Sequence, residues 1–320
     1  MERVLVTGGG GFIGSNLVRA LLREGYAVRV LESYATGRRE NLQDVLEDIE
    51  LLEHPQGVLD PRVCERAAAG ASCILHQAAI PSVPRSIEDP IRSDQVNAGG
   101  TLNMLEAARK AGARRFIYAS SSSVYGDAPG EVRRENAKPS PLSPYAVSKL
   151  TAELYAALYH RLHGLETVGL RYFNVFGPRQ DPHSAYAAVV PIFTRRLLAG
   201  ERPTIYGDGE QSRDFTYVDN AVHGNLLALK AGRAEGEVLN LATGECHTVN
   251  ELFGALRDLT GAGGLEPLYA PARPGDVRNS LADISRTTQL LAYSPAVGFA
   301  EGLRRTVAWH AERAPRGARR

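Results

Sequence analysis

The sequence predicts an α/β fold, in which a doubly wound parallel sheet is joined to a smaller C-terminal α+β lobe. The first observation is that, over the first half of the 320-residue chain, short apolar β-rich runs alternate with longer segments of helical period. The second is that short connections join them, which places helices on both faces of a parallel sheet. The third is the second half, where proline, glycine and single aromatic residues interrupt the pattern.

The elements expected in the first half follow one another as strand, helix, strand. The predicted strands are Val4–Thr7, Ala27–Leu31, Ser72–His76, Arg115–Ala119 and Thr167–Asn174. The predicted helices are Phe12–Glu24, Pro61–Ala69, Ser93–Ala111 and Pro144–His163. The last of these begins with a proline, which is favoured in the first turn of a helix.

Composition excludes several classes of function. A net charge of +1 gives no overall field that would attract nucleic acid or an acidic membrane surface. No apolar run is long enough to span a bilayer, and the first residues resemble a strand more than a signal peptide, so we expect a cytoplasmic protein. The cysteines, Cys64, Cys73 and Cys246, are far apart and odd in number, which predicts buried thiols and no metal site.

A glycine-rich turn joins the first strand to the first helix. Gly8, Gly11 and Gly14 have the spacing G-x-x-G-x-x-G. Glycines let the backbone turn tightly and approach a pyrophosphate, and the helix N-terminus supplies N–H groups and a positive dipole end. Because a tenth of the chain is glycine, a flexible loop is the alternative, but the strand before and the helix after favour a Rossmann-like dinucleotide site.

The end of the second strand bears on which dinucleotide binds. Glu32 follows Gly14 by 18 residues, and an acid there bonds the adenosine ribose hydroxyls and repels a 2′-phosphate. This favours NAD over NADP, whereas Arg38 and Arg39 argue the other way. The alternative for Glu32 is a solvated strand end.

A candidate catalytic pair stands at the start of the fourth predicted helix. Tyr145 and Lys149 have the spacing Y-x-x-x-K, and residues four apart share one helix face. A lysine ammonium near the phenol favours the phenolate and lowers the tyrosine pKa. Four serines, 120–123, stand where the preceding strand ends, so one of their hydroxyls can bridge the tyrosine and a substrate oxygen.

These motifs occur together with RYFNVFG at 171–177, RDF at 213–215 and RPGD at 273–276. In this order, over nearly the whole chain, they resemble an extended short-chain dehydrogenase/reductase. More narrowly, the sequence is similar to nucleotide-sugar 4-epimerases of the UDP-glucose/UDP-N-acetylglucosamine type. AAIPSVPRSIEDP at 78–90 and LSPYAVSK at 142–149 are close to bacterial UDP-N-acetylhexosamine epimerases.

The resemblance implies a tightly held NAD and a division into two functional parts. We expect residues 1–175, with returning segments near 214–243, to form the NAD-binding domain. Residues 176–213 and 244–320 are then the nucleotide-sugar-binding lobe. The implied cofactor contacts are Gly8, Gly11, Phe12, Ile13, Gly14, Glu32, Thr36, Gly37, Ala78, Ala79, Asn97, Ser120, Tyr145, Lys149 and Tyr172.

One departure concerns the adenine end of the cofactor. The family often has Gly-Asp at the end of the third strand, with the aspartate touching adenine. Here Gly57-Val58 stands at that place, and the acid is absent or displaced to Asp60.

The resemblance also implies a mechanism. Tyr145, as phenolate, takes the proton of the sugar 4-hydroxyl while hydride passes from C4 to NAD; the 4-keto sugar turns, and hydride returns to its other face. Ser121 joins the tyrosine, and Lys149 binds the nicotinamide ribose. Ser122 and Ser123 stand where related 4,6-dehydratases have Asp and Glu, so the machinery for dehydration is missing.

For the substrate, the resemblance implies a UDP-sugar held by a set of residues spread over the chain. They are Ser121, Ser122, Asn174, Arg213, Arg273, Asp276 and Ser280. Ser280 stands where some UDP-glucose-restricted epimerases have tyrosine, so the N-acetyl sugars should be accepted along with UDP-glucose. The family also implies a homodimer formed through the helices Ser93–Ala111 and Pro144–His163.

Two alternative functions share parts of this motif set. One is epimerisation or decarboxylation of UDP-glucuronate, but those relatives commonly have Thr where Asn174 stands. The other is a non-catalytic NAD-binding sensor, which would usually have lost the Tyr145 and Lys149 pair. Both alternatives are less consistent with the residues present.

Overall fold

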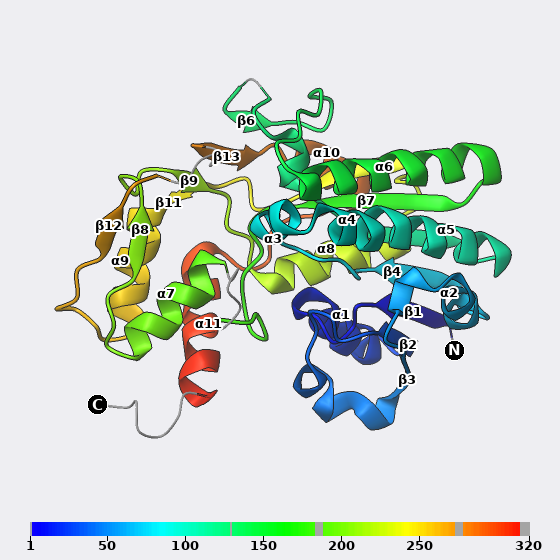
Figure 1. Cartoon of the computed structure of the whole chain (residues 1–320), viewed down its shortest axis with the longest axis horizontal. Coiled ribbons are helices and arrows are strands. Elements are labelled where there is room, and N and C mark those ends of the chain that lie inside the picture. The colour runs from blue at the N-terminus through cyan, green and yellow to red at the C-terminus, as the bar shows by residue number, and fades with distance from the viewer. Residues whose placement is uncertain (1, 129, 183–187, 273–277, 314–320) are drawn as a thin grey trace.

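The computed structural model describes residues 2–128, 130–182, 188–272 and 278–313. Its centre is a seven-stranded parallel sheet in the order β10-β7-β5-β4-β1-β2-β3, and a smaller lobe lies beyond the carboxyl ends of these strands (Figure 1). The strands are β1 Arg3–Thr7, β2 Ala27–Glu32, β3 Ile49–Glu53, β4 Cys73–His76, β5 Arg115–Ser121, β7 Glu166–Tyr172 and β10 Glu237–Leu241.

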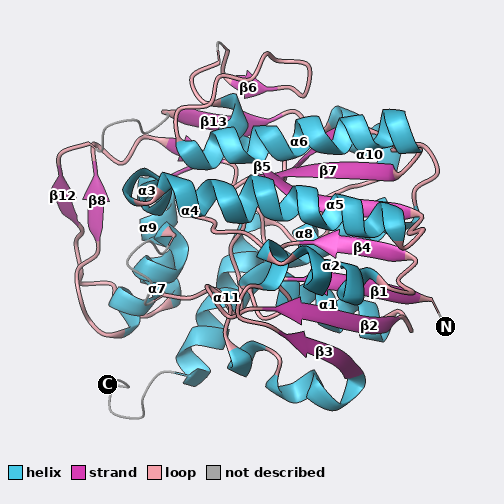
Figure 2. Ribbon diagram, turned by 45° about the vertical axis from the view of Figure 1, so that its right-hand side comes forward, coloured by secondary structure: helices cyan, strands magenta, loops and turns pink. Residues whose placement is uncertain are grey.

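Helices cover both faces of this sheet (Figure 2). One face carries α1 Phe12–Arg23, α8 Val218–Lys230 and α10 Ser285–Leu291; the other carries α2 Pro61–Ala68, α5 Gly100–Lys110 and α6 Pro144–His163. The alternation of side chains along β1 shows why both faces are apolar, since Val4 and Val6 enter one core cluster and Leu5 enters the other. The predicted doubly wound fold is thus confirmed.

Two predicted elements differ from the structure. The helix expected at Ser93–Ala111 is α4 Pro90–Asp94, then a π-helical turn at Gln95–Gly99, then α5. The strand expected to reach Asn174 ends at Tyr172, because Asn174 has a left-handed φ of 34° that breaks the extended conformation. β3 was not predicted as an element, since it is an edge strand with half-exposed side chains and weak alternation.

The smaller lobe is an α+β structure with its own core. Its strands form a four-stranded sheet, β11-β9-β13-β6, and a pair, β12-β8. They are β6 Val132–Arg133, β8 Thr204–Tyr206, β9 Ser212–Arg213, β11 His247–Thr248, β12 Leu268–Ala270 and β13 Asn279–Ala282. The remaining helices are α3 Val83–Glu88, which packs on α4 and α6, and α7 Val189–Leu198, α9 Val249–Leu259 and α11 Phe299–Arg313, which build a cluster around Phe176, Phe193 and Phe253.

Within the described ranges, no helix combines the length and apolar character needed to cross a membrane. Cys64 and Cys73 are buried in the core as expected, whereas Cys246 is half-buried in the smaller lobe.

Candidate active site

The glycine turn has the geometry of a pyrophosphate cradle. Gly8 has φ +69°, and a Cβ there would lie 2.8 Å from the backbone of Ala78. A Cβ at Gly14 would lie 2.1 Å from the Gly8 carbonyl oxygen, so a side chain at either position would close the turn. Gly11 is the N-cap of α1 and supplies no side-chain cap, which leaves first-turn N–H groups such as that of Phe12 open to an anion.

Glu32 lies at the end of β2, as predicted, and organises the loop around the turn. Its Oε2 accepts the Gly10 N–H at 2.7 Å, and its Oε1 accepts the N–H groups of Ser33 and Tyr34 at 2.8 Å each. The Glu32 carboxylate therefore accepts hydrogen bonds from three backbone N–H groups, and these bonds fix the loop that follows β2. The sequence did not indicate this structural role.

The two arginines that argued for a 2′-phosphate are both engaged with carboxylates. Arg38 pairs with Asp181 at 2.7 Å, and Arg39 pairs with Glu53 at 2.5 Å. Both arginines are thus paired with carboxylates within the protein, which weakens the sequence argument for NADP.

The loop after β4 is held against α6 by Asn97. Its Oδ1 accepts the Ile80 N–H at 2.8 Å, and its Nδ2 donates to the Ile80 carbonyl at 3.3 Å and to Ser148 Oγ at 3.1 Å. This loop contains Ala78 and Ala79, and the Ala79 carbonyl accepts a long hydrogen bond of 3.5 Å from Thr36 Oγ1. Four cofactor contacts expected from the family, Thr36, Ala78, Ala79 and Asn97, thus lie in one connected wall.

Asp60 is a helix cap. Its carboxylate accepts the N–H groups of Arg62 and Val63 at the start of α2, while Val58 is buried. The acid at position 60 is thus committed to α2, which does not support its being the displaced adenine-contacting residue.

Tyr145 and Lys149 lie on one face of α6, as their spacing predicts, and Ser121 at the end of β5 lies beside Tyr145. The Lys149 Nζ lies 5.9 Å from the centroid of the Tyr145 ring and donates to the Ala119 carbonyl at 2.8 Å. The Tyr145 phenol and the Ser121 hydroxyl share a hydrogen bond. Because Lys149 is only 5% exposed, its charge is held in a low-dielectric setting.

Burial dominates the ionisation of both groups. It lowers the pKa of Lys149 to about 8, with the charge of Glu153 acting in the opposite direction. Burial also raises the pKa of Tyr145, and the hydrogen bond with Ser121 opposes that rise. The expectation of a tyrosine pKa lowered by the lysine is therefore wrong for the protein alone, since desolvation of the phenolate is the larger effect.

A buried histidine, which the sequence did not single out, lies behind this pair. His76 Nδ1 is 2.8 Å from Thr7 Oγ1, and its Nε2 is 3.1 Å from Thr101 Oγ1. Burial, and then the charge of Lys149, lower the pKa of His76 to about 3, so the ring is neutral. His76 links β1, β4 and α5 and adds no charge to the site.

The four serines have four different surroundings. Ser120 is buried and donates to Glu153 at 2.5 Å, while Ser123 donates to Ser121 from both its N–H, at 3.1 Å, and its hydroxyl, at 2.9 Å. The Ser122 hydroxyl is half-buried and makes no hydrogen bond to the described residues. Of the family's expected contacts, Ser120 is thus turned to the interior, whereas Ser122 is half-buried.

Tyr172 is likewise engaged within the protein. Its phenol donates to Gln77 Oε1 at 3.2 Å and accepts from Asn225 Nδ2 at 2.8 Å, which ties β7 to the end of β4 and to α8.

Three of the expected substrate residues are joined by Asp214, which the sequence reasoning missed. The Asp214 carbonyl accepts from Asn174 Nδ2 at 3.2 Å, and the Asp214 N–H donates to the Ser280 carbonyl at 2.9 Å. Arg213 precedes it in β9 and pairs with Ser280 of β13. The Asp214 carboxylate accepts hydrogen bonds from Thr243 and Gly244, so it fixes the segment that carries Arg213 relative to the loop after β10.

Arg273 and Asp276, the other expected substrate contacts, lie outside the described residues.

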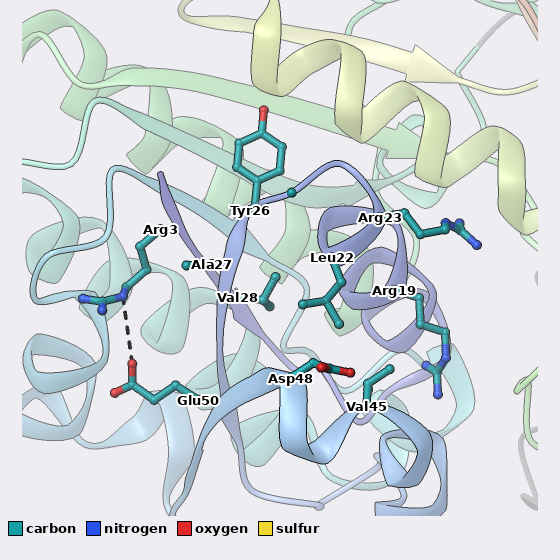
Figure 3. Close-up of a pocket in the computed structure, with 11 residues that line it drawn as sticks. Arg3, Arg19, Leu22, Arg23, Tyr26, Ala27, Val28, Val45, Asp48 and Glu50 are labelled. Atoms are coloured by element: carbon teal, nitrogen blue, oxygen red, sulfur yellow. Dashed lines mark ion pairs between the residues drawn. The ribbon is translucent and has the colours of Figure 1, made fainter. Parts of the chain in front are cut away.

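Two cavities lie outside the group of Ser121, Tyr145 and Lys149, although Gly37, an expected cofactor contact, lines the second. One, of about 730 Å³, is at the amino ends of β1 and β2, where Figure 3 shows Arg19 and Arg23 of α1 on one side and the Arg3–Glu50 ion pair on the other. The second, of about 910 Å³, lies between the loop after β2 and α11. Tyr145 lines neither cavity. The candidate active site is therefore identified from the chemistry and arrangement of its side chains, and not from a cavity.

The parallel sheet, the glycine cradle and the Ser121–Tyr145–Lys149 group define the class of this protein as an extended short-chain dehydrogenase/reductase. NAD is the cofactor of this class of site, and the open N–H groups of α1 fit its pyrophosphate.

The chain belongs to the NAD dependent epimerase/dehydratase family, whose model matches residues 4–242. It is similar to a crystal structure of UDP-glucose 4-epimerase from Thermotoga maritima with UDP-glucose (39% identity, 98% of this chain and 100% of the other, TM-score 0.92). It is also similar to UDP-N-acetylglucosamine 4-epimerase from Methanobrevibacter ruminantium with UDP-N-acetylmuramic acid (39%, 98% and 99%, 0.92). The UDP-glucose 4-epimerase of Thermus thermophilus, in complex with NAD, is 40% identical (96% and 98%, 0.86).

Proposed function

We propose that this protein is a UDP-hexose 4-epimerase that interconverts UDP-glucose and UDP-galactose and also accepts the corresponding N-acetyl sugars. The observation that carries the proposal is the end of β5, where Ser121 meets Tyr145 and Lys149 while hydroxyls stand at Ser122 and Ser123. Similar proteins that bind UDP-glucose and a UDP-N-acetyl sugar support the nucleotide-sugar class.

Each side chain has a defined task in this reaction. NAD held at the glycine turn of Gly8, Gly11 and Gly14 would supply a reversible hydride acceptor for C4 of the sugar. Tyr145 removes the proton of the 4-hydroxyl as a general base and later gives it back. Ser121, which shares a hydrogen bond with the phenol, orients the same substrate oxygen. Lys149, charged below a pH of about 8, attracts the negative charge that develops on the phenol during proton transfer, against the burial that raises the Tyr145 pKa.

Dehydration is disfavoured because its proton carriers are missing. Eliminating water requires an acid for the leaving hydroxide and a base for the carbon-bound proton. Ser122 has a hydroxyl that does not ionise in the working range, and the Ser123 hydroxyl is committed to Ser121. The site therefore supports hydride exchange at C4 without loss of water.

Asn174 favours a hexose over a uronate. It adopts a left-handed φ of 34°, which asparagine tolerates and a β-branched threonine resists. The threonine common in the UDP-glucuronate enzymes would therefore not replace it here without a change of backbone.

Ser280 supports acceptance of the N-acetyl sugars. It is half-buried in β13 beside Arg213, where a tyrosine ring would fill the volume needed by an acetamido group. A site roomy enough for the larger sugar rejects the smaller one by only ~1–3 kcal/mol. Activity on both kinds of sugar follows.

We further propose that the protein is a homodimer, because an apolar stripe runs along α6. Leu154 and Leu162 are 61% and 71% exposed, and Ile91 is 71% exposed on α4, which packs against α6. The stripe, with its flanking residues, consists of Val147, Leu154, Leu158, Leu162, Ile87 and Ile91. Exposed apolar side chains gathered on neighbouring helices are unfavourable in water and fit a second copy of the same surface.

The function is tested by incubating the isolated protein, without added NAD, with UDP-glucose, UDP-N-acetylglucosamine and UDP-glucuronate in parallel. Epimers of the first two are expected, and turnover without added cofactor separates an enzyme from a sensor. Ser280→Tyr should lose the N-acetyl activity and keep the UDP-glucose activity, while Ser280→Ala keeps both. Turnover of UDP-glucuronate alone would contradict the proposed function, and turnover of UDP-glucose alone would contradict the role of Ser280.

A further inference from the structure

A buried ion pair lies one helical turn beyond Lys149 on α6. The Glu153 carboxylate is 5% exposed, and Arg171 of β7 donates to it from Nε at 2.9 Å and from Nη2 at 2.7 Å. The Glu153 Oε1, which accepts the bond from Arg171 Nε, also accepts a hydrogen bond of 2.5 Å from the hydroxyl of Ser120. Three elements, α6, β5 and β7, thus meet on one carboxylate directly behind the candidate active site.

Stability does not by itself account for charges at this place. Desolvating two ions costs about as much as their attraction returns, and apolar residues of similar volume often replace such a pair without loss. The position of the pair is more informative. Residue i+4 of a helix lies on the same face as residue i, so Glu153 faces the side of Lys149, and Ser120 immediately precedes Ser121.

We propose that Glu153 is a positioning residue for the reaction: its carboxylate keeps the buried Lys149 ammonium charged and, through Ser120, fixes the end of β5 that carries Ser121. The inference rests on the proposed function for the roles of Lys149 and Ser121. The contacts between Glu153 and its neighbours do not depend on which sugar is bound.

The groups around Lys149 show why a negative charge matters there. Tyr145 faces it from α6, neutral His76 from β4 and the Ala119 carbonyl from β5. Burial works against the ammonium and lowers its pKa to about 8, and Glu153 is the carboxylate that opposes this effect.

The cation of Arg171 stands behind Glu153, where its guanidinium lies over the Tyr125 ring at 4.6 Å. Without the carboxylate, both burial and the Arg171 cation would oppose the charge of Lys149.

Direct titration of Lys149 tests the inference, because the chain has only four lysines. With ¹³Cε-labelled lysine and NAD-bound protein, the NMR signal of Lys149 is assigned by its loss in Lys149→Arg. We expect Glu153→Gln to lower the Lys149 pKa by about 1 or more. The control is Glu106→Gln, which removes a carboxylate paired with Arg109 on α5 and should leave Lys149 unchanged.

A double variant separates positioning from folding. Glu153→Gln alone leaves the Arg171 cation unpaired, whereas Glu153→Gln with Arg171→Gln leaves two amides that can hydrogen-bond each other. We expect the double variant to fold, to keep a lowered Lys149 pKa and to lose kcat at alkaline pH. At a pH where Lys149 is neutral in the variant and still charged in the wild type, kcat should fall about tenfold. KM should change little.

A double variant with the wild-type Lys149 titration and pH profile would overturn the proposal, as would one that fails to fold, since the pair would then serve the fold alone. If no UDP-hexose is turned over but the Lys149 pKa still falls in the variants, the proposed function fails while the coupling between Glu153 and Lys149 stands.

Discussion

Replacing Lys149 with methionine is expected to stabilise the NAD-free protein while abolishing its activity. Burial lowers the Lys149 pKa from 10.5 to about 8, and each pKa step of 1 corresponds to ~1.4 kcal/mol, so the buried charge costs about 3 kcal/mol near neutral pH. Methionine avoids this cost but leaves the Ala119 carbonyl without its lysine donor, which subtracts about 1 kcal/mol. The variant should thus be more stable by about 2 kcal/mol at pH 7.

The difference in unfolding free energy between the wild type and the Lys149→Met variant should also depend on pH, which gives a more specific test. Below a pH of about 8 the lysine is charged in both the folded and the unfolded states, so the full cost is present. As the pH rises from 8 to 10.5, the unfolded chain binds more protons than the folded one, and the wild type gains stability relative to the variant. Urea denaturation of both proteins at several pH values measures this difference. A free-energy difference independent of pH between 7 and 10.5 would refute the reasoning.

Three further predictions concern catalysis, assembly and cofactor binding. Tyr145→Phe should lower kcat by about 10²-fold or more while NAD remains bound, and near-normal turnover would remove the tyrosine from its assigned role. Leu154→Glu should give a monomer in sedimentation velocity, whereas Leu46→Glu, an exposed leucine elsewhere, should not; a dimer in both would place the interface off α6. Gly14→Ala should lose NAD on purification, because its Cβ would meet the Gly8 carbonyl at 2.1 Å; retention equal to that of the unobstructed Gly254→Ala would contradict the cradle.

The parts of the fold that follow local rules could be predicted from the sequence. The strand and helix periods gave the sheet and its covering helices, and Pro144 marked the start of α6 correctly. The Y-x-x-x-K spacing brought Tyr145 and Lys149 to one face because helix geometry is regular.

The parts that depend on tertiary contacts could not be predicted. Asn97 interrupts a helix with a π-helical turn because its amide is tied to a loop from another part of the chain. Glu32 was expected to face the ribose, but it also clamps three backbone N–H groups that only the folded loop brings near. The tyrosine pKa was misjudged because spacing shows a neighbouring charge and does not show the depth of burial.

The central claim is that hydride leaves C4 of a UDP-hexose and returns to the same carbon. The most direct measurement is to incubate the protein with UDP-glucose deuterated at C4, in ordinary water and without added NAD, and to analyse the product by NMR and mass spectrometry. The account predicts UDP-galactose that keeps deuterium at C4. Absence of the epimer, or an epimer whose deuterium has been replaced by solvent hydrogen, would contradict it.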